Sequence, residues 1–424
     1  MLRKYLNKLK SSNGKVLLEN FISLSALQLA GILLPLITLP YVLRTIGFDK
    51  YGLIVFSASL VAYFTSLTDF SFQVTATRDV AVFRSSPKKL DIIYSKVLII
   101  KVFFLLISWG IIGTIVCLVP SFYEYWYIYL YTGISLLGQV LFPEWFFQGI
   151  EKMRYITYLN LGIKLFFTLC IFLFIKKESD YWIYPLLQSM GFIGAGIVGQ
   201  YLLMTKYKLK IVRVSFKSLI STVKSNTPIF VNRFVPTLYN NTSTFILGII
   251  GTDFLVGIYQ AILTIVNLAA SLLDIFSRVF FPFLNRRKDA FNMYKKMMFS
   301  ATAIMIIGIL ILNKVIFWYL NISYEDAFLI LVILSCGLIG YSLSNIFGLN
   351  YFIVYRHDKL VMQNTLIASL IGFVLSYPLI SYYSILGAAI NLSLARCVMG
   401  GGLYYKYLSV NKKTIYNENS RISN

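Results

Sequence analysis

The chain has 424 residues, of which 58% are hydrophobic and only 13% are charged, and its mean hydropathy is +0.73. Soluble domains are about one quarter charged, so this composition excludes one or two soluble domains with a polar surface. The net charge of +22 is typical of nucleic-acid binding in a soluble protein, but here the hydropathy indicates a polytopic membrane protein.

The first predicted element follows a short basic segment. Five Lys or Arg residues lie within 1–15, and the apolar stretch 17–43 is long enough to cross a bilayer. A signal peptide would have a shorter apolar core followed by small residues. We therefore expect 17–43 to be the first transmembrane helix.

Eleven more apolar stretches follow along the chain. Each is about 20 residues long, which is the length that a helix needs to cross the hydrocarbon core. The sequence thus predicts an all-α polytopic membrane protein with about twelve transmembrane helices. The loops are too short to hold a soluble catalytic domain, so we expect no enzyme. The predicted spans are 17–43, 51–75, 93–118, 127–147, 158–175, 183–204, 228–250, 256–281, 297–318, 326–354, 361–382 and 386–408.

The basic residues predict the orientation. With the N-terminus on the cytoplasmic side, 28 of the 39 Lys and Arg residues fall in cytoplasmic loops or tails, and four fall outside. This bias predicts that both termini are cytoplasmic. It also explains the positive charge as membrane topology, so nucleic acid is not an expected partner.

The longest internal loop, 205–227, is basic and divides the spans into two sets of six. We predict a six-helix bundle over 1–204, a cytoplasmic linker over 205–227, and a second bundle with a short tail over 228–424. Asp69 follows Gly52 by 17 residues, and Asp274 follows Gly257 by the same interval. This correspondence suggests two parallel repeats around a central cavity, with the substrate between them.

Several sequence patterns do not predict a nucleotide, metal or cofactor site. The glycines at 194, 196 and 199 spell a dinucleotide-binding pattern, but they lie inside a membrane span, where they favour close helix packing. The glycines at 400–402 are interpreted in the same way. The single histidine, His357, and the scattered cysteines predict no metal site, disulfide or cofactor. The cysteines are Cys117, Cys170, Cys336 and Cys397.

Charged residues inside predicted spans are candidates for substrate binding, because each costs about 2.5–3.5 kcal/mol at a helix centre unless it faces a cavity or a partner. Together they would form a cationic lining suited to a phosphate group. Snorkelling towards the interface is the alternative for two of them, Lys164 and Arg233, and pairing with Asp274 is the alternative for Arg278. The candidates are Lys164, Arg233, Arg278 and Arg396.

Asp69 and Asp274 are candidates for a different role. Desolvation favours the neutral form of a carboxyl group, so acids at this depth could bind and release protons and couple transport to a proton gradient. The alternative is a structural ion pair, Asp274 with Arg278 and Asp69 with Arg78 or another cation.

Several local strings stand out in the first half of the chain. They are 34–41 (LPLITLPY), 44–47 (RTIG), 68–72 (TDFSF), 76–78 (ATR) and 143–153 (PEWFFQGIEKM). Together they resemble the Wzx-type O-antigen and polysaccharide-repeat-unit flippases of the multidrug/oligosaccharidyl-lipid/polysaccharide exporter superfamily. The WFFQG part of the last string is the most specific, and no general role is assigned to the Glu144 that precedes it.

The resemblance implies a flippase that moves an undecaprenyl-diphosphate-linked oligosaccharide, an O-antigen or capsule repeat unit, to the outer leaflet of the bacterial inner membrane by alternating access. It also implies contact with membrane lipids, and with a polysaccharide polymerase and a chain-length regulator. A cation-coupled multidrug exporter of the same superfamily is the nearest alternative, followed by a membrane polysaccharide polymerase.

Overall fold

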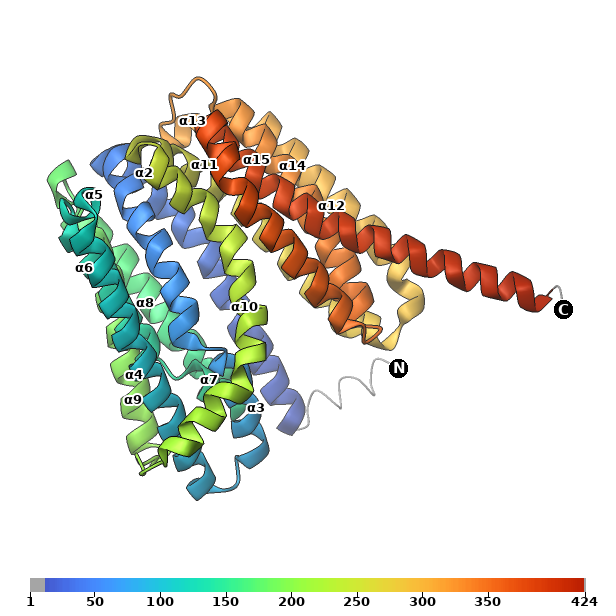
Figure 1. Cartoon of the computed structure of the whole chain (residues 1–424), viewed down its shortest axis with the longest axis horizontal. Coiled ribbons are helices and arrows are strands. Elements are labelled where there is room, and N and C mark those ends of the chain that lie inside the picture. Colours follow the sequence, from blue (N-terminus) through green and yellow to red (C-terminus); the bar gives the residue numbers. More distant parts are fainter. Residues whose placement is uncertain (1–11, 423–424) are drawn as a thin grey trace. The chain divides into compact units, whose positions relative to one another are not determined.

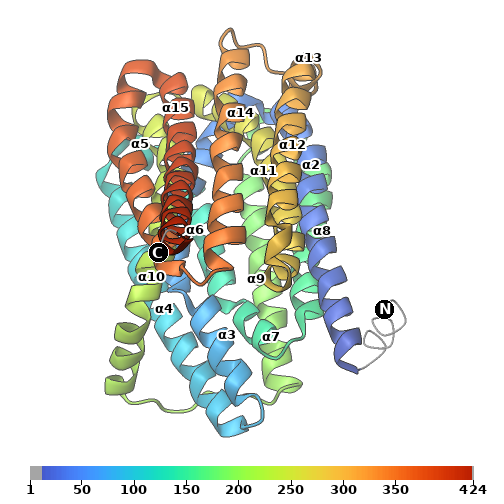
Figure 2. The same ribbon diagram turned by 90° about the vertical axis from the view of Figure 1, so that its right-hand side faces the viewer.

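The computed structural model describes the backbone of residues 12–422 and the side chains of residues 27–409, and all the regular secondary structure in this range is helical (Figures 1 and 2). The first half contains α2 (Ser12–Asp69), α3 (Phe72–Phe83), α4 (Pro87–Leu118), α5 (Pro120–Tyr123), α6 (Trp126–Leu141), α7 (Glu144–Gly149), α8 (Met153–Phe174), η1 (Glu178–Asp180) and α9 (Ile183–Thr205). The second half contains α10 (Phe216–Ile250), α11 (Asp253–Arg286), η2 (Lys288–Ala290), α12 (Phe291–Ile311), α13 (Asn313–Leu320), α14 (Ala327–Leu343), the π-helix η3 (Ser344–Ile353) and α15 (Asp358–Ile422).

The helices account for the predicted number of membrane spans. Eight helical stretches in the described range are long and apolar enough to cross a membrane. Two of these each contain two helices, because the backbone leaves the helical region at Gly47 in α2 and at Ser384 in α15. Two further long elements are the 16-residue α6 and the 35-residue α10, which carries the polar stretch 240–244 (NNTST). The prediction of an all-α membrane protein with about twelve helices is thereby confirmed.

The described residues pack as two compact units. The first holds the chain up to Gly47 together with Ser57–Phe234, and the second holds Phe48–Phe56 together with the chain from Val235 onwards. In the first unit α6 packs on both α4 and α9, and α8 packs on α9 (Figure 1). In the second unit α14 packs on α11, α12 and α15. Of the predicted linker 205–227, residues 206–215 form a loop, and α10 begins at Phe216.

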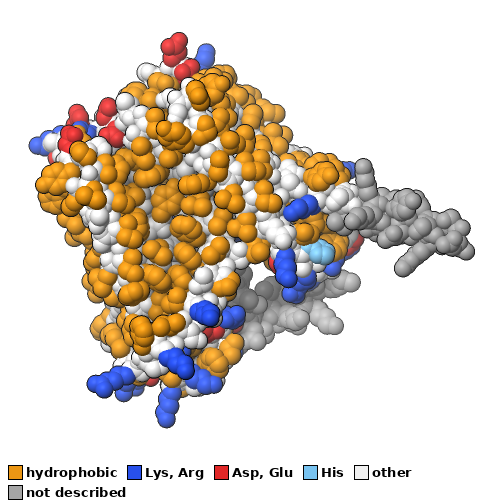
Figure 3. Space-filling model, in the orientation of Figure 1, with side chains coloured by type: hydrophobic (Ala, Val, Ile, Leu, Met, Phe, Trp, Pro, Cys, Tyr) orange, Lys and Arg blue, Asp and Glu red, His pale blue; other side chains and the backbone are white. Residues whose placement is uncertain are grey.

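The flank of the first unit is apolar, as a membrane protein requires. Large hydrophobic side chains on α4, α8 and α9 are exposed, including Phe103 at 57%, Leu169 at 62% and Ile197 at 57%. In the space-filling view hydrophobic side chains cover this flank, and Lys and Arg side chains gather at its lower end (Figure 3). Such a surface cannot be left in water but suits a bilayer.

Two predicted spans end earlier than the sequence indicated. The span 51–75 was expected to be continuous, but the helix stops at Asp69, and Phe70 and Ser71 adopt positive φ angles of 43° and 60°. This backbone conformation is unfavourable for residues other than glycine. It is held in place because the Phe70 ring stacks between Phe104 and Phe230, with centroids 4.6 and 4.7 Å away.

The span 127–147 is likewise shorter than predicted. α6 ends at Leu141, and Pro143, which cannot donate a backbone hydrogen bond, precedes the separate short helix α7. The three aromatic residues of the WFFQG string, Trp145, Phe146 and Phe147, are 4%, 1% and 0% exposed. Burial of each contributes about 1.5–3 kcal/mol to stability. The string therefore anchors α7 in the core of the first unit.

Each unit contains one close helix crossing that depends on a pair of glycines, and the two crossings are alike. In the first unit, a Cβ atom added at Gly138 of α6 would overlap the backbone at Phe192 of α9, and one added at Gly196 would lie 2.8 Å from the Gly138 carbonyl oxygen. In the second unit the same contacts join Gly340 of α14 to Arg396 of α15, and Gly400 to the Gly340 carbonyl oxygen. In this crossing Arg396 occupies the position that Phe192 has in the first unit.

The crossing of α14 and α15 gives a test of packing with a matched control. A Cβ atom at Gly400 would overlap backbone, whereas one at Gly401 would meet nothing within 4 Å. We expect Gly400→Ala to lower the free energy of unfolding by about 1–3 kcal/mol through overpacking. Gly401→Ala should be neutral or stabilising by up to about 1 kcal/mol, because alanine favours the helix. Thermal unfolding in detergent compares the two variants, and equal midpoints would contradict this packing.

Candidate substrate site

The two helix breaks of the first unit lie next to each other. α3, which begins after the break at Phe70 and Ser71, packs along α7, which begins after the break at Pro143. The hydroxyl group of Thr77 in α3 donates a hydrogen bond to the Trp145 carbonyl oxygen at 3.1 Å. The two interrupted helices therefore form a common wall.

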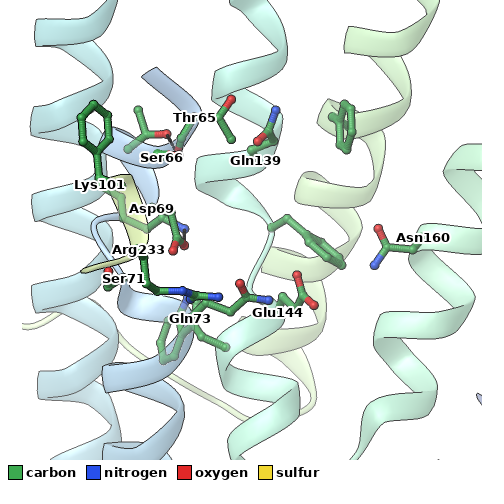
Figure 4. A pocket seen from close by; sticks show the side chains of 15 residues that line it. Thr65, Ser66, Asp69, Ser71, Gln73, Lys101, Gln139, Glu144, Asn160 and Arg233 are labelled. Carbon is green, nitrogen blue, oxygen red and sulfur yellow. Dashed lines mark hydrogen bonds and ion pairs between the residues drawn. The ribbon is translucent and has the colours of Figure 1, made fainter. Parts of the chain in front are cut away.

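A cavity of about 360 Å³ opens at this wall, entirely within the first unit (Figure 4). Its lining combines charged, amide, hydroxyl and aromatic side chains from α2, α3, α4, α6, α7, α8, α9 and α10. The charged residues are Asp69, Lys101, Glu144 and Arg233; the uncharged polar residues are Thr65, Ser66, Thr68, Ser71, Gln73, Gln139 and Asn160; and the aromatic residues are Phe142, Trp145, Phe192 and Phe234.

Asp69 and Lys101 form an ion pair on one side of this cavity. The Lys101 Nζ atom lies 3.6 Å from the Asp69 Oδ1 atom. The lysine side chain is 5% exposed and the aspartate side chain is 34% exposed. A buried ammonium group is costly without a partner, so Asp69 stabilises Lys101 in place. The sequence left open a structural ion pair of Asp69 with Arg78 or another cation, and the structure has this pair with Lys101, while Arg78 pairs with Asp79 at 3.5 Å.

Glu144 and Arg233 provide the second acid and the second cation. The Arg233 side chain extends across the cavity towards Gln73 and Glu144 (Figure 4). The Gln73 amide lies against the Glu144 carboxylate, and both Lys101 and Arg233 act on that carboxylate electrostatically. Two carboxylates and two cations thus share one small space, and their formal charges balance.

The helix break itself adds polar backbone to the cavity. The C-terminal turn of the α2 helix ends there at Asp69, and the N-terminal turn of α3 begins there with Ser71 and Gln73. Helix N-terminal amides favour anions, and helix C-terminal carbonyls favour cations. The Ser71 hydroxyl is buried and has no hydrogen-bond partner among the described residues. The wall therefore offers donors and acceptors to a polar ligand.

Lys164 lies close to the cavity but does not line it. It follows Asn160 by one helical turn on α8, and it is half-buried. Its Nζ atom approaches Gly31 of α2, lying 2.9 Å from the position of a Cβ atom there. Of the sequence-predicted residues, Asp69 and Arg233 meet in the cavity, and Lys164 lies one turn from its edge.

The remaining predicted residues lie in the second unit. Arg278 pairs with Asp274 at 3.8 Å, and Asp274 also accepts a hydrogen bond of 3.0 Å from the Asn345 amide. Arg396 is 6% exposed and donates a hydrogen bond of 2.9 Å to Asn267. The pairing expected as the alternative for Asp274 and Arg278 is therefore present.

Arg396 is the most deeply buried of the predicted cations. Its guanidinium group lies over the Tyr341 ring, 5.5 Å from the centroid, and the Tyr341 hydroxyl lies against Asp274. The Arg396 Nη1 atom is buried without a hydrogen-bond partner in the described part of the chain. Arg396 thus contacts Tyr341, and Tyr341 in turn contacts Asp274.

Lys101 and Glu144 are the charged cavity residues that the sequence-based prediction did not include. Lys101 lies in the middle of an apolar span, where any cation requires a partner, and this depth could have identified it. Glu144 follows the proline that ends α6, and only the break at that proline turns it into the cavity. The predicted roles of the individual charges stay predictions.

The arrangement can bind a ligand that carries both phosphate and hydroxyl groups. Arg233 offers a planar fork of donors suited to phosphate oxygens, and Lys101 adds a point charge. Gln73, Gln139 and Asn160 supply amide donors and acceptors. The aromatic side chains give the cavity apolar walls. No cluster of metal-ligating residues is found among the described residues.

Comparison with known proteins agrees with this fold. The polysaccharide biosynthesis protein family matches residues 17–288. A protein of Escherichia coli (strain K12) named "Putative O-antigen transporter" is 27% identical over 402 residues, covering 92% of this chain and 96% of its own length. A protein of the same name from Shigella dysenteriae is 22% identical, covering 88% of this chain and 96% of its own length.

Two solved structures share the fold. The lipid II flippase MurJ in an inward closed conformation has a TM-score of 0.68 at 16% identity, and the match covers 92% of this chain and 87% of that one. An inward-facing multidrug resistance MATE family transporter of the MOP superfamily has a TM-score of 0.63 at 12% identity, covering 91% of this chain and 98% of that one.

All four proteins are named as transporters or flippases, in agreement with the prediction that the chain is not an enzyme. The resemblance inferred from the local strings is confirmed for the family and for the fold. Because the family match covers more than half of its length, the chain belongs to the polysaccharide biosynthesis protein family.

Proposed function

We propose that the chain is a flippase that moves a polyprenyl-diphosphate-linked oligosaccharide, with undecaprenyl as the expected carrier, from the cytoplasmic to the outer leaflet of the bacterial inner membrane. The observation that carries the proposal is the membrane-embedded cavity in which Arg233 and Lys101 lie among amide, hydroxyl and aromatic side chains. A diphosphate with sugars cannot cross hydrocarbon unaided, whereas the polyprenyl tail can stay in the bilayer. The names of the curated relatives support an O-antigen repeat unit as the cargo.

The depth of the cavity suits loading from the cytoplasmic leaflet. Basic loops around 84–89, 152–154 and 206–213 lie at one end of the first unit, where Arg84 contacts Glu151 at 3.4 Å. The positive-inside rule assigns this end to the cytoplasm, and with it both termini. The helix breaks lie in the half of the unit nearest to these loops (Figure 1). A head group would therefore enter the cavity at the level of the inner leaflet.

Coupling to protons follows from the balanced charge of the cavity. A diphosphate brought near Asp69 and Glu144 is repelled by both carboxylates, and protonation of either one removes that repulsion. Anion binding and proton uptake therefore favour each other. Asp69 is our coupling candidate in the first unit, together with Glu144. Asp274 is the corresponding candidate in the second unit, where Arg278 and Asn345 hold it.

A second candidate function is cation-coupled multidrug export, with organic cations as the drugs, and the MATE neighbour is named a multidrug resistance transporter. The observation that favours it is the pair of carboxylates beside Trp145 and Phe192, since cations bind both acids and aromatic faces. Lys101 and Arg233 oppose it, because they neutralise those acids. Contact with a polysaccharide polymerase and a chain-length regulator stays a prediction.

Ligand-induced stabilisation distinguishes the two functions. A ligand that binds the folded state raises the free energy of unfolding by about 1.4 kcal/mol at ten times its Kd. We expect the purified protein to unfold at higher temperature in the presence of polyprenyl-diphosphate oligosaccharide, and not with the polyprenol alone. A rise produced only by lipophilic organic cations would favour the exporter and contradict the flippase.

A further inference from the structure

We propose that a cluster of basic and aromatic side chains, where the start of α8 meets the end of α9, binds the phosphate group of an anionic phospholipid. The cluster consists of Lys152, Arg154, Tyr155, Lys206 and Tyr207, none of which lines the cavity. It lies at the end of the first unit that the positive-inside rule assigns to the cytoplasm. The inference concerns a lipid of the surrounding membrane and not the transported molecule, so it goes beyond the proposed function.

The two tyrosines of the cluster are held by the buried aromatic core of the first unit. The Tyr155 ring packs against Phe147, with centroids 5.2 Å apart, and the Tyr207 ring packs against Phe146 at the same distance. Phe146 and Phe147 belong to the WFFQG string and are 1% and 0% exposed. Tyr155 at the start of α8 and Tyr207 just after α9 therefore form a fixed aromatic base.

Three cations lie against this aromatic base. The Lys206 Nζ atom lies 5.1 Å from the centroid of the Tyr155 ring and donates a hydrogen bond of 2.5 Å to the hydroxyl group of that residue. The Arg154 guanidinium group lies 5.4 Å from the same centroid, and the Lys152 Nζ atom lies 5.6 Å from the centroid of the Tyr207 ring. These cation–π contacts restrict long side chains before a ligand binds, which lowers the entropic cost of binding.

Two of the cations have aromatic partners instead of acidic ones. Lys152 and Lys206 form no ion pair with a carboxylate in the described part of the chain. Glu151, which directly precedes Lys152, contacts Arg84 at 3.4 Å. Cations gathered without acids repel one another, so an anion placed among them is stabilised. A phosphate group suits this position because its oxygens accept hydrogen bonds from several N–H donors at once.

The surface next to the cluster indicates that this phosphate belongs to a lipid. Tyr158 and Leu159 follow Tyr155 by three and four residues, so they lie on the same face of α8. Both line an apolar groove between α8 and α9, and Tyr158 is 67% exposed. A phospholipid combines a phosphate with acyl chains, and anionic phospholipids of the cytoplasmic leaflet attract basic side chains next to the membrane. The cations select the head group, and the apolar surface accommodates the start of the chains.

Removal of two exposed charges tests the site while leaving the aromatic base intact. We expect the Lys152→Gln/Lys206→Gln variant to bind dioleoyl phosphatidylglycerol about tenfold more weakly than the wild type, a change of about 1.4 kcal/mol. The Lys210→Gln/Lys217→Gln variant is the matched control, since it removes the same charge from exposed positions outside the cluster and should bind as the wild type does. Dioleoyl phosphatidylcholine, which has the same chains and no net charge, should bind weakly to all three proteins. Thermal stabilisation against lipid concentration in a neutral detergent gives each Kd.

Three results would overturn the assignment. They are equal affinity of the wild type for the two lipids, unchanged affinity of the Lys152→Gln/Lys206→Gln variant for phosphatidylglycerol, and an equal loss in the control variant, which would indicate a general attraction of charge. Glycerophosphoglycerol, the head group without acyl chains, tests the lipid itself: stabilisation at the same concentrations as the intact lipid would contradict a lipid occupant. None of these measurements involves translocation, so failure of the proposed function and failure of this inference are distinguishable.

Discussion

Replacement of Arg233 by glutamine is expected to reduce translocation of the lipid-linked oligosaccharide by about 10- to 100-fold. Arg233 spans the cavity and is one of its two cations. A hydrogen bond to a charged group contributes about 1.5–3 kcal/mol, and a bidentate contact to phosphate lies at the upper end of this range. Glutamine keeps most of the length of the side chain but removes the charge. The initial rate of head-group movement in reconstituted vesicles measures the effect.

Arg213→Gln is the matched control for this experiment. Arg213 is exposed in the loop between α9 and α10 and does not line the cavity. The same chemical change there should leave the translocation rate within about twofold of wild type, because Arg213 does not line the cavity and solvent and salt screen its charge. If both variants transport equally well, the cavity of the first unit is not the path of the diphosphate.

The second large effect concerns stability and comes from the ion pair of Asp69 and Lys101. Asp69→Asn removes the partner of a lysine that is only 5% exposed, so we expect it to lower the free energy of unfolding by about 1–3 kcal/mol. Lys101→Met should cost less, because the aspartate that remains is 34% exposed and keeps part of its hydration. The double variant should recover most of the loss, since it leaves no unpaired buried charge.

Thermal unfolding of these four proteins gives the coupling energy of the pair. Asp79→Asn is a suitable comparison, since Asp79 and its partner Arg78 are 46% and 69% exposed, and we expect little change there. Additive effects of the two single substitutions would show that the pair contributes no coupling. In that case Lys101 would have to be stabilised by Glu144 or by the helix C-terminus of α2 instead.

The number and type of the helices were predictable because they follow from length and hydropathy. The spans 158–175 and 183–204 lie within five residues of the bounds of α8 and α9. The turn near 384 was also expected, between two apolar stretches. These features depend on the exclusion of backbone polar groups from hydrocarbon, a constraint that acts on each segment separately.

The helix breaks that build the cavity were not predictable to the same extent. The break at Phe70 and Ser71 contains neither glycine nor proline, and the rings of Phe104 and Phe230, distant in sequence, hold it. The break before α7 does contain Pro143, which could have been interpreted as the end of a helix. Local sequence therefore contains a signal for one break, which the prediction did not use, and tertiary packing determined the other.

The candidate site was predicted only in part for a related reason. Asp69 and Arg233 were identified because charges inside spans need a cavity or a partner. Glu144 was not predicted, because its position in the cavity depends on the helix break at Pro143. Glycine patterns could not be assigned individually from the sequence either: Gly196 is in tight contact with α6, whereas Gly194, two residues earlier, is open to the membrane.

The central claim is tested most directly by the movement of a fluorescent polyprenyl-diphosphate oligosaccharide in vesicles that contain the purified wild-type protein. Loss of head-group access to a membrane-impermeant reagent reports translocation. We predict a protein-dependent rate that falls when Arg233 is replaced by glutamine and that is absent for a polyprenyl lipid lacking the diphosphate. A rate equal to that of protein-free vesicles, with the protein shown to be folded and inserted, would contradict the claim.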